Sequence, residues 1–183
     1  MWYVVRTVVG QEKKAMEKCR NAIPVSTVTE LFSPSYEYMR RYQGEWHTIQ
    51  DVLFPGYIFM ESEAPEELEN YLERIPDVVS PVCIGGGFYP ISKEEEEFLR
   101  SLFDETYCIR YSLGYLVDRE LIVEKGPLRG KSRYVTKIDR HRRCANLTLH
   151  LFEKEIKVLV GLGIPARLTA TEYQEMKEAV KTG

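Results

Sequence analysis

The sequence of 183 residues is poor in the side chains that build metal and disulfide sites. It has four widely separated cysteines without a C-x-x-C pair, and three histidines without ligand spacing, which are His47, His141 and His150. Zinc sites and disulfide frameworks need cysteines and histidines at short, repeated spacings. We therefore expect no metal site, no disulfides and a reduced, cytoplasmic protein.

Long apolar runs and enzymatic motifs are missing as well. No apolar run approaches the roughly 18 residues of a membrane span, and the N-terminal residues lack a secretory pattern, so we expect no membrane partner. The patterns G-x-x-x-x-G-K-[ST], G-x-G-x-x-G and G-x-S-x-G are absent. Residues 85–87 are a glycine run typical of a loop, because no helix pattern follows directly. Spacing leaves a Cys–His pair open, but nothing supports one. We expect neither enzymatic activity nor a cofactor.

The charge is distributed unevenly. Residues 1–110 carry 11 Lys/Arg against 19 Asp/Glu, a net charge of −8, whereas residues 111–183 carry 14 against 9, a net charge of +5. Eight basic residues lie between 125 and 143, where Asp139 is the only acid: Lys125, Arg129, Lys131, Arg133, Lys137, Arg140, Arg142 and Arg143. Two interpretations stay open, a solvated basic face and a surface that binds a polyanion.

The first 104 residues predict an α+β sandwich, a sheet with helices packed on it. The run Tyr3–Val9 has the composition of a buried strand, and 11–20 has the spacing of an amphipathic helix. A polar-tipped hairpin that turns at Gln43-Gly44 is expected next. Further elements are expected as a strand over 57–60, a helix from Pro65 that Pro76 ends, a strand over 78–84, and a helix that Ser92-x-x-Glu95 caps.

The C-terminal part has a different pattern, with short strand-like runs between polar turns. These runs lie at 120–123, 133–138, 144–151 and 156–160, and such short, closely spaced strands are typical of a small barrel. A last helix over 172–180 follows the capping pattern Thr169-x-x-Glu172. The expected fold class is therefore α+β: an N-terminal α/β sandwich, then a small β-barrel and a short terminal helix.

Two segments carry most of the functional information. In Leu53–Met60, Pro-Gly fixes the entry to a strand in which Tyr57 and Phe59 point to one face and Ile58 and Met60 to the other. The pattern alone favours core packing, and the alternative is an exposed apolar patch that binds a partner. The second segment, Gly126–Lys131, is a turn that begins the basic stretch.

Together these segments resemble the NusG family of transcription elongation factors. Trp2–Val5, Gly10–Glu12 and Leu53–Tyr57 are similar to its NGN domain, and Leu121–Gly130 is similar to its KOW motif. The resemblance covers nearly the whole chain and implies a protein without catalysis. It implies an NGN domain over 1–106, a linker over 107–115 and a KOW β-barrel over 116–168. The sequence adds a helix over 169–183 after the barrel.

The resemblance also implies partners. An NGN domain binds the clamp helices of RNA polymerase through an apolar cavity, which Tyr57 and Phe59 would line here with Phe54, Val82 and Ile84 as neighbours. A KOW domain recruits other factors or nucleic acid. The candidate nucleic-acid contacts are Lys125, Arg129, Lys131, Arg133, Lys137, Arg140, His141, Arg142 and Arg143.

Three departures from the general family pattern indicate a specialised member. Family members usually have a glycine near position 132 or 133, where this chain has Ser132 and Arg133. Residues 140–143 form a basic turn, and a helix follows the barrel. The chain is most similar to the antiterminator LoaP subfamily, whose KOW domain recognises leader RNA. The alternative is a general NusG-type elongation factor whose barrel binds a ribosomal protein or a termination factor through 151–154.

Two further basic groups are candidates for contacting non-template DNA. They are Lys13, Lys14 and Lys18 on the first predicted helix, and Arg40 and Arg41 near the hairpin tip. We favour solubility as their role. The chain is expected to be a monomer.

Overall fold

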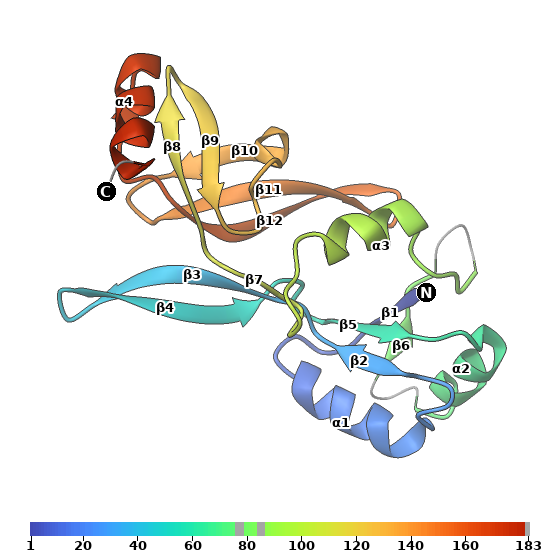
Figure 1. Ribbon diagram of the computed structural model, residues 1–183. Helices are drawn as coiled ribbons and strands as arrows, with labels where there is room; N and C mark the ends of the chain where they lie inside the picture. The colour runs from blue at the N-terminus through green and yellow to red at the C-terminus, as the bar shows by residue number, and fades with distance from the viewer. Residues whose placement is uncertain (76–78, 84–86, 182–183) are drawn as a thin grey trace. The chain divides into compact units, whose positions relative to one another are not determined.

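The computed structural model describes residues 1–75, 79–83 and 87–181, which form two compact units (Figure 1). The first unit combines Met1–Ser35, Asp51–Cys108 and Leu149–Ile156. The second combines Tyr36–Gln50, Ile109–Thr148 and Lys157–Gly183. Each unit is therefore assembled from several stretches of the chain.

The first unit is built on an antiparallel sheet with the strand order β2-β5-β1-β6, in which Val4 on β1 lies opposite Phe59 on β5. One face of this sheet packs on α1 and α2 in a core that includes Tyr3, Ala15 and Leu68. The elements are β1 (Trp2–Arg6), α1 (Glu12–Ala22), β2 (Glu30–Phe32), β5 (Tyr57–Glu61), α2 (Pro65–Leu72), β6 (Ser80–Pro81) and α3 (Lys93–Arg100).

An aromatic cluster covers the other face of the same sheet. The ring of Phe59 lies 6.1 Å from that of Trp2 and 5.5 Å from that of Phe32, centroid to centroid. On α3, the guanidinium of Arg100 lies 4.3 Å from the Trp2 ring, and it forms ion pairs with Glu61 and Glu96. The sheet is therefore buried on both faces.

The second unit contains most of a hairpin and most of a larger sheet, of which only the stretch Leu149–Ile156 belongs to the first unit. The hairpin strands are β3 (Ser35–Tyr42) and β4 (Glu45–Val52), and β7 (Cys108–Ile109) pairs beside β3. The larger sheet has six strands in the order β10-β11-β12-β8-β13, with β9 on β8. Its elements are β8 (Ser112–Val117), β9 (Glu120–Lys125), η1 (Ser132–Tyr134), β10 (Val135–Asp139), β11 (Cys144–Leu151), β12 (Lys154–Gly163) and β13 (Arg167–Leu168), followed by α4 (Ala170–Lys181).

Local sequence explains several of these boundaries. Gln43 and Gly44 have φ values of 50° and 88°, which suit the two-residue turn predicted for the hairpin. Ser92 and Glu95 cap α3 reciprocally, so that predicted capping box is confirmed. Thr169 and Glu172 form the same reciprocal bonds at the start of α4, as the sequence predicted.

The sequence misplaced some element ends. Of the expected first strand, Val8 and Val9 lie outside β1 and are exposed. The strand expected over 78–84 is observed as β6 alone, and residues 78 and 84 to 86 lie outside the described part of the chain. The segment interpreted as a linker, 107–115, contains β7 and the first part of β8.

Gly114, which made the segment 107–115 look like a linker, lies within strand β8. A Cβ at this glycine would come within 2.5 Å of the Ile122 carbonyl oxygen, and the pairing of β8 with β9 shifts register here. Glycine within a strand often marks such a close approach or bulge. Gly114 therefore serves strand packing in this structure.

Candidate functional site

The aromatic strand β5 contributes buried and accessible residues to the candidate polymerase surface. Phe59 is fully buried and Phe54 is 6% exposed. The expectation that Phe59 lines a surface is therefore contradicted, because the aromatic cluster covers it. Tyr57 and Val82 are half-buried and reach the surface, and Ile84 lies outside the described residues.

Tyr57 and Val82 line one hollow of about 620 Å³ in the first unit. The β11–β12 turn contributes to the same hollow, and the ring of Phe152 lies 6.3 Å from that of Tyr57. Phe152 and Glu153 in this turn have φ values of 56° and 60°, in the left-handed region that favours glycine. The accessible part of the predicted polymerase site is therefore Tyr57, Val82 and their neighbours in this hollow.

A buried carboxylate ties together the two turns that enter this region. One Oε1 atom of Glu12 accepts hydrogen bonds from the backbone N–H groups of Gly10, at 3.0 Å, and Gly56, at 2.7 Å. Burial raises the pKa of the Glu12 carboxyl, but hydrogen bonds from the backbone N–H groups of Glu12, Gly56 and Gly10 outweigh it, so this pKa lies below its ordinary value. Glu12 thus holds the start of β5 in place.

The basic residues of the candidate nucleic-acid site lie mainly on the surface of the second unit. All are exposed except Lys131 and Arg143, which are half-buried. They are spread over the end of β9, the turn that follows, η1, β10 and the β10–β11 turn, so they do not form a single row. The densest group is the turn Arg140–Arg143.

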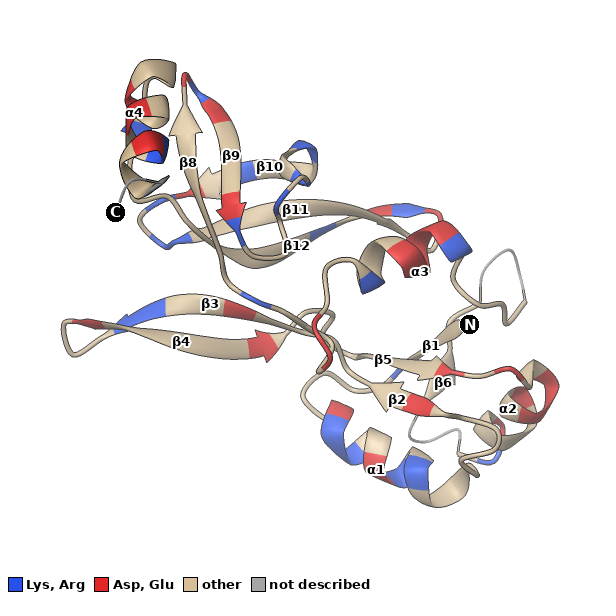
Figure 2. Cartoon of the chain, viewed as in Figure 1, with Lys and Arg blue, Asp and Glu red and all other residues tan. Residues whose placement is uncertain are grey.

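The structure also brings residues to this turn that the sequence did not connect with it. A hollow of about 470 Å³ is lined by Arg40, Arg41 and Trp46 of the β3–β4 hairpin together with His141 and Arg142 of the turn. The guanidinium of Arg143 lies 4.0 Å from the centre of the Trp46 ring. Figure 2 shows the blue basic segment at the far end of β3, away from its acidic start. The sequence signal that could have found this surface was Trp46, which follows Arg40 and Arg41 just after the predicted Gln43-Gly44 turn.

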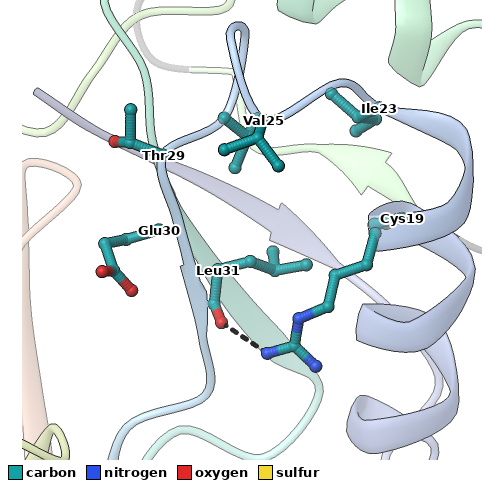
Figure 3. A pocket seen from close by; sticks show the side chains of 8 residues that line it. Cys19, Ile23, Val25, Thr29, Glu30 and Leu31 are labelled. Atoms are coloured by element: carbon teal, nitrogen blue, oxygen red, sulfur yellow. Dashed lines mark hydrogen bonds between the residues drawn. The ribbon is translucent and has the colours of Figure 1, made fainter.

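A third hollow, of about 260 Å³, lies between α1 and β2 (Figure 3). Ile23, Val25 and Leu31 line it, and Arg20 closes one side by donating a hydrogen bond to the Leu31 carbonyl at 3.1 Å. Burial raises the pKa of the neighbouring Cys19 thiol to about 11, so the thiol stays protonated near neutral pH. Thr29 and Glu30 also line this hollow, so its lining is mixed, with aliphatic, polar and charged side chains.

Cys144 and His141 line the same hollow, which bears on the Cys–His alternative. Burial raises the pKa of the Cys144 thiol, which opposes the thiolate that a nucleophile requires. Within the described residues, no group of three His, Cys, Asp or Glu side chains could hold a metal ion, and no helix is long and apolar enough to cross a membrane.

Comparisons with known proteins agree on one family. The family model described as transcription termination factor nusG matches residues 1–100. The transcription termination/antitermination protein NusG of Chlamydia trachomatis is 30% identical over 107 residues, which cover 56% of this chain and 57% of that protein. The chain thus spans little more than half the length of that relative. The Thermus thermophilus protein of the same name is 24% identical over 170 residues, covering 86% of this chain and 92% of that protein.

A solved structure of Thermotoga maritima NusG, described as showing domain interaction, has the same fold. Its TM-score is 0.50 with 22% sequence identity, and the match covers 87% of this chain and 92% of that one. This likeness confirms the predicted α+β fold class. The class of protein is that of non-enzymatic transcription factors, in agreement with the expected lack of catalysis. The chain belongs to the NusG family.

Proposed function

We propose that this protein is a transcription termination/antitermination factor that binds RNA polymerase through its first unit and a leader RNA through its second. Curated relatives named transcription termination/antitermination protein support the first part of this proposal. The observation that carries the RNA part is the exposed basic turn Arg140–Arg142, next to the half-buried Arg143. Both roles require a cytoplasmic protein, where polymerase and nascent RNA meet.

The proposal that the protein binds RNA polymerase depends on the hollow that Tyr57 and Val82 line. The hollow combines the aromatic rings of Tyr57 and Phe152 with the charged side chains of Arg6, Glu153 and Lys154. Aromatic anchors beside polar groups are typical of protein–protein interfaces. The rings of Phe54 and Phe59 are buried in the same unit, with 5.7 Å between their centres, and Phe59 is on the same strand as Tyr57. We assign contact with the clamp helices to Tyr57 and Val82 and a supporting role to the two phenylalanines.

The proposal that the protein binds a leader RNA depends on the positive charge and the exposure of the turn Arg140–Arg143. Arginine bonds phosphate oxygens bidentately, and structured RNA is recognised largely through its shape and backbone. Arg140 and Arg142 are exposed, and the Asp139 carboxylate accepts the Arg142 backbone N–H at 2.9 Å, which shapes the turn. A leader-guided antiterminator of the LoaP type would use such a turn to recruit itself to selected transcripts.

The test is the triple charge reversal Arg140→Glu, Arg142→Glu and Arg143→Glu in the full chain. Read-through at a terminator is measured with purified polymerase, with and without a leader RNA upstream. We expect leader-dependent read-through to be lost while polymerase binding persists, because the altered side chains belong to the second unit. The matched control reverses three exposed lysines of α1, Lys13, Lys14 and Lys18, and should keep leader-dependent read-through. Leader-independent read-through that survives the triple change would contradict the RNA-guided function.

A general elongation factor is the second candidate, favoured by the β11–β12 turn. Phe152 occupies a left-handed backbone position at this tip and remains half-buried. A large aromatic there is a suitable anchor for a protein partner, such as a ribosomal protein or a termination factor. Phe152→Ala should weaken binding of such a partner and leave RNA binding unchanged, whereas the triple charge reversal should do the opposite.

A further inference from the structure

We propose that the β3–β4 hairpin and the β10–β11 turn form one binding site for unpaired RNA. In this site Arg40, Arg41 and Arg142 bind phosphates, and Trp46 stacks on a base. This inference extends the proposed binding of leader RNA and rests on that proposed function. It assigns the hairpin, whose arginines the sequence related to solubility or to DNA, to the same ligand as the basic turn.

The hairpin packs closely against the larger sheet inside the second unit, and the contact of Arg143 with Trp46 joins it to the turn. A Cβ at Gly161 of β12 would collide with the carbonyl oxygen of Glu37 on β3, so only glycine allows β3 to lie this close. The Glu37 carboxylate accepts the Tyr111 backbone N–H at 3.1 Å and pairs with Arg110 at 2.6 Å. These contacts fix the base of the hairpin against the sheet. They also pair Glu37, the carboxylate nearest to Arg40 and Arg41 along β3, with Arg110 and the Tyr111 N–H.

The charges around the hollow have one sign. Arg40, Arg41, His141 and Arg142 line it, and no carboxylate does so in the part of the chain that the structure describes. Arg41 donates one hydrogen bond to the Gly44 carbonyl, at 3.3 Å, which leaves most of the donors of its guanidinium for a ligand. Several arginines from two elements around one concave surface favour a phosphate backbone.

An aromatic platform completes the site. Trp46 and Tyr38 line the hollow, and Arg143 places its guanidinium over the Trp46 ring. Arg143 does so with a φ of 52°, in the left-handed region that residues other than glycine seldom adopt. Single-stranded nucleic acid is bound where bases stack on aromatic rings or guanidinium planes beside a cationic groove.

The size of the hollow argues for an unpaired nucleotide. Its volume of about 470 Å³ lies in the range of sites for small ligands, and a duplex presents its bases stacked and paired. RNA is the occupant we infer because structured transcripts expose unpaired bases in loops and bulges. Single-stranded DNA shares the phosphate and base chemistry, so the experiment must separate the two.

The experiment measures binding of labelled oligouridylate to the full chain over a range of salt concentrations. The test variant is Arg40→Glu with Arg41→Glu, and the matched control is Lys13→Glu with Lys14→Glu on the exposed face of α1. We expect the arginine pair to lower affinity about tenfold or more and to reduce the salt slope by about 1.4, or about 0.7 for each lost phosphate contact. The lysine pair should bind like the wild type.

Trp46→Leu tests the platform separately. It should weaken oligouridylate binding about fivefold or more and leave binding of a fully paired RNA duplex unchanged, because only unpaired bases stack. Oligodeoxyuridylate, which differs by the 2′-hydroxyl alone, should bind more weakly than oligouridylate. Equal binding of the two would overturn the assignment to RNA and indicate a site for single-stranded DNA.

The outcomes distinguish this site from the proposed function as a whole. If the hairpin variants bind oligouridylate like the wild type while the triple reversal at 140, 142 and 143 abolishes leader RNA binding, the composite site is wrong and the proposed binding of leader RNA stands. If the wild type binds neither oligouridylate nor leader RNA at low salt, both are wrong. Loss of oligouridylate binding in the arginine pair, with unchanged thermal unfolding, supports the composite site.

Discussion

At the scale of single residues, the two aromatics on one face of β5 have different environments. Phe59 is fully buried among rings, whereas Tyr57 reaches the surface. Phe59→Ala should therefore lower the free energy of unfolding by about 3–5 kcal/mol. Tyr57→Ala should cost clearly less and should weaken polymerase binding. Urea unfolding and a binding assay with polymerase measure the two effects, and a stable Phe59→Ala protein that no longer binds polymerase would contradict this division.

Glu12 gives a prediction about pH. Since its carboxyl pKa is lowered in the folded protein, the stabilisation is fully present above the unfolded-state pKa, near about 4.3, and is lost as the pH falls through the lower folded-state pKa. Glu12→Gln should cost about 1–3 kcal/mol at neutral pH, because the backbone N–H groups that bond this carboxylate, among them those of Gly10 and Gly56, lose a charged acceptor. Urea unfolding of both proteins should show this difference shrinking in acid. A difference independent of pH would contradict the role of the charge.

Some of the site was predictable at this scale, and some was not. The alternation of Tyr57 with Ile58 follows from strand geometry, so the sequence could tell which side chains share a face. It could not tell that Trp2 and Phe32, remote in sequence, bury Phe59. The contact between Arg143 and Trp46 likewise depends on the tertiary fold. The sequence around either residue alone does not predict it.

At the scale of elements, the terminal helix is fixed by its cap. The Thr169 side chain accepts the Glu172 backbone N–H, and the Glu172 carboxylate accepts the Thr169 N–H at 2.7 Å. Thr169→Ala should destabilise α4 by about 1 kcal/mol, whereas Thr171→Ala in the same turn should have a smaller effect. Hydrogen exchange of the α4 amides measures both. Equal protection in the two variants would show that packing alone holds the helix.

Element types were more predictable than element ends. Capping boxes and the Gln43-Gly44 turn are encoded within a few residues, so the sequence located α3, α4 and the hairpin. The strand β8 was missed because Ser112 and Gly114 suggest a tether when read locally. Their actual roles, a buried hydroxyl that accepts the Leu128 N–H at 3.3 Å and a close approach to β9, need partners distant in the chain.

At the scale of the whole molecule, the uneven charge predicts two kinds of binding. If about four phosphates are contacted, log K for RNA should fall with log salt at a slope of roughly −3 to −4. Polymerase binding through the hollow at Tyr57 should depend less on salt, because the charges that line it, Arg6, Lys154 and Glu153, are of both signs and nearly balance. Titrations of the same preparation at several ionic strengths measure both slopes. Equal slopes would mean that one surface serves both ligands.

The division of the chain between the units has a consequence for its synthesis. The hairpin residues Tyr36–Gln50 belong to the second unit, but the rest of that unit begins only at Ile109. Translation adds about 5–20 residues per second, so synthesis of the roughly 60 intervening residues takes about 3–12 s. During this time the hairpin lacks the rest of its unit. The first unit is likewise incomplete until Ile156 has been made. The nascent chain must therefore hold an unfinished part of each unit. The first unit is complete once Ile156 has left the exit tunnel, whereas the second also needs β13 and α4.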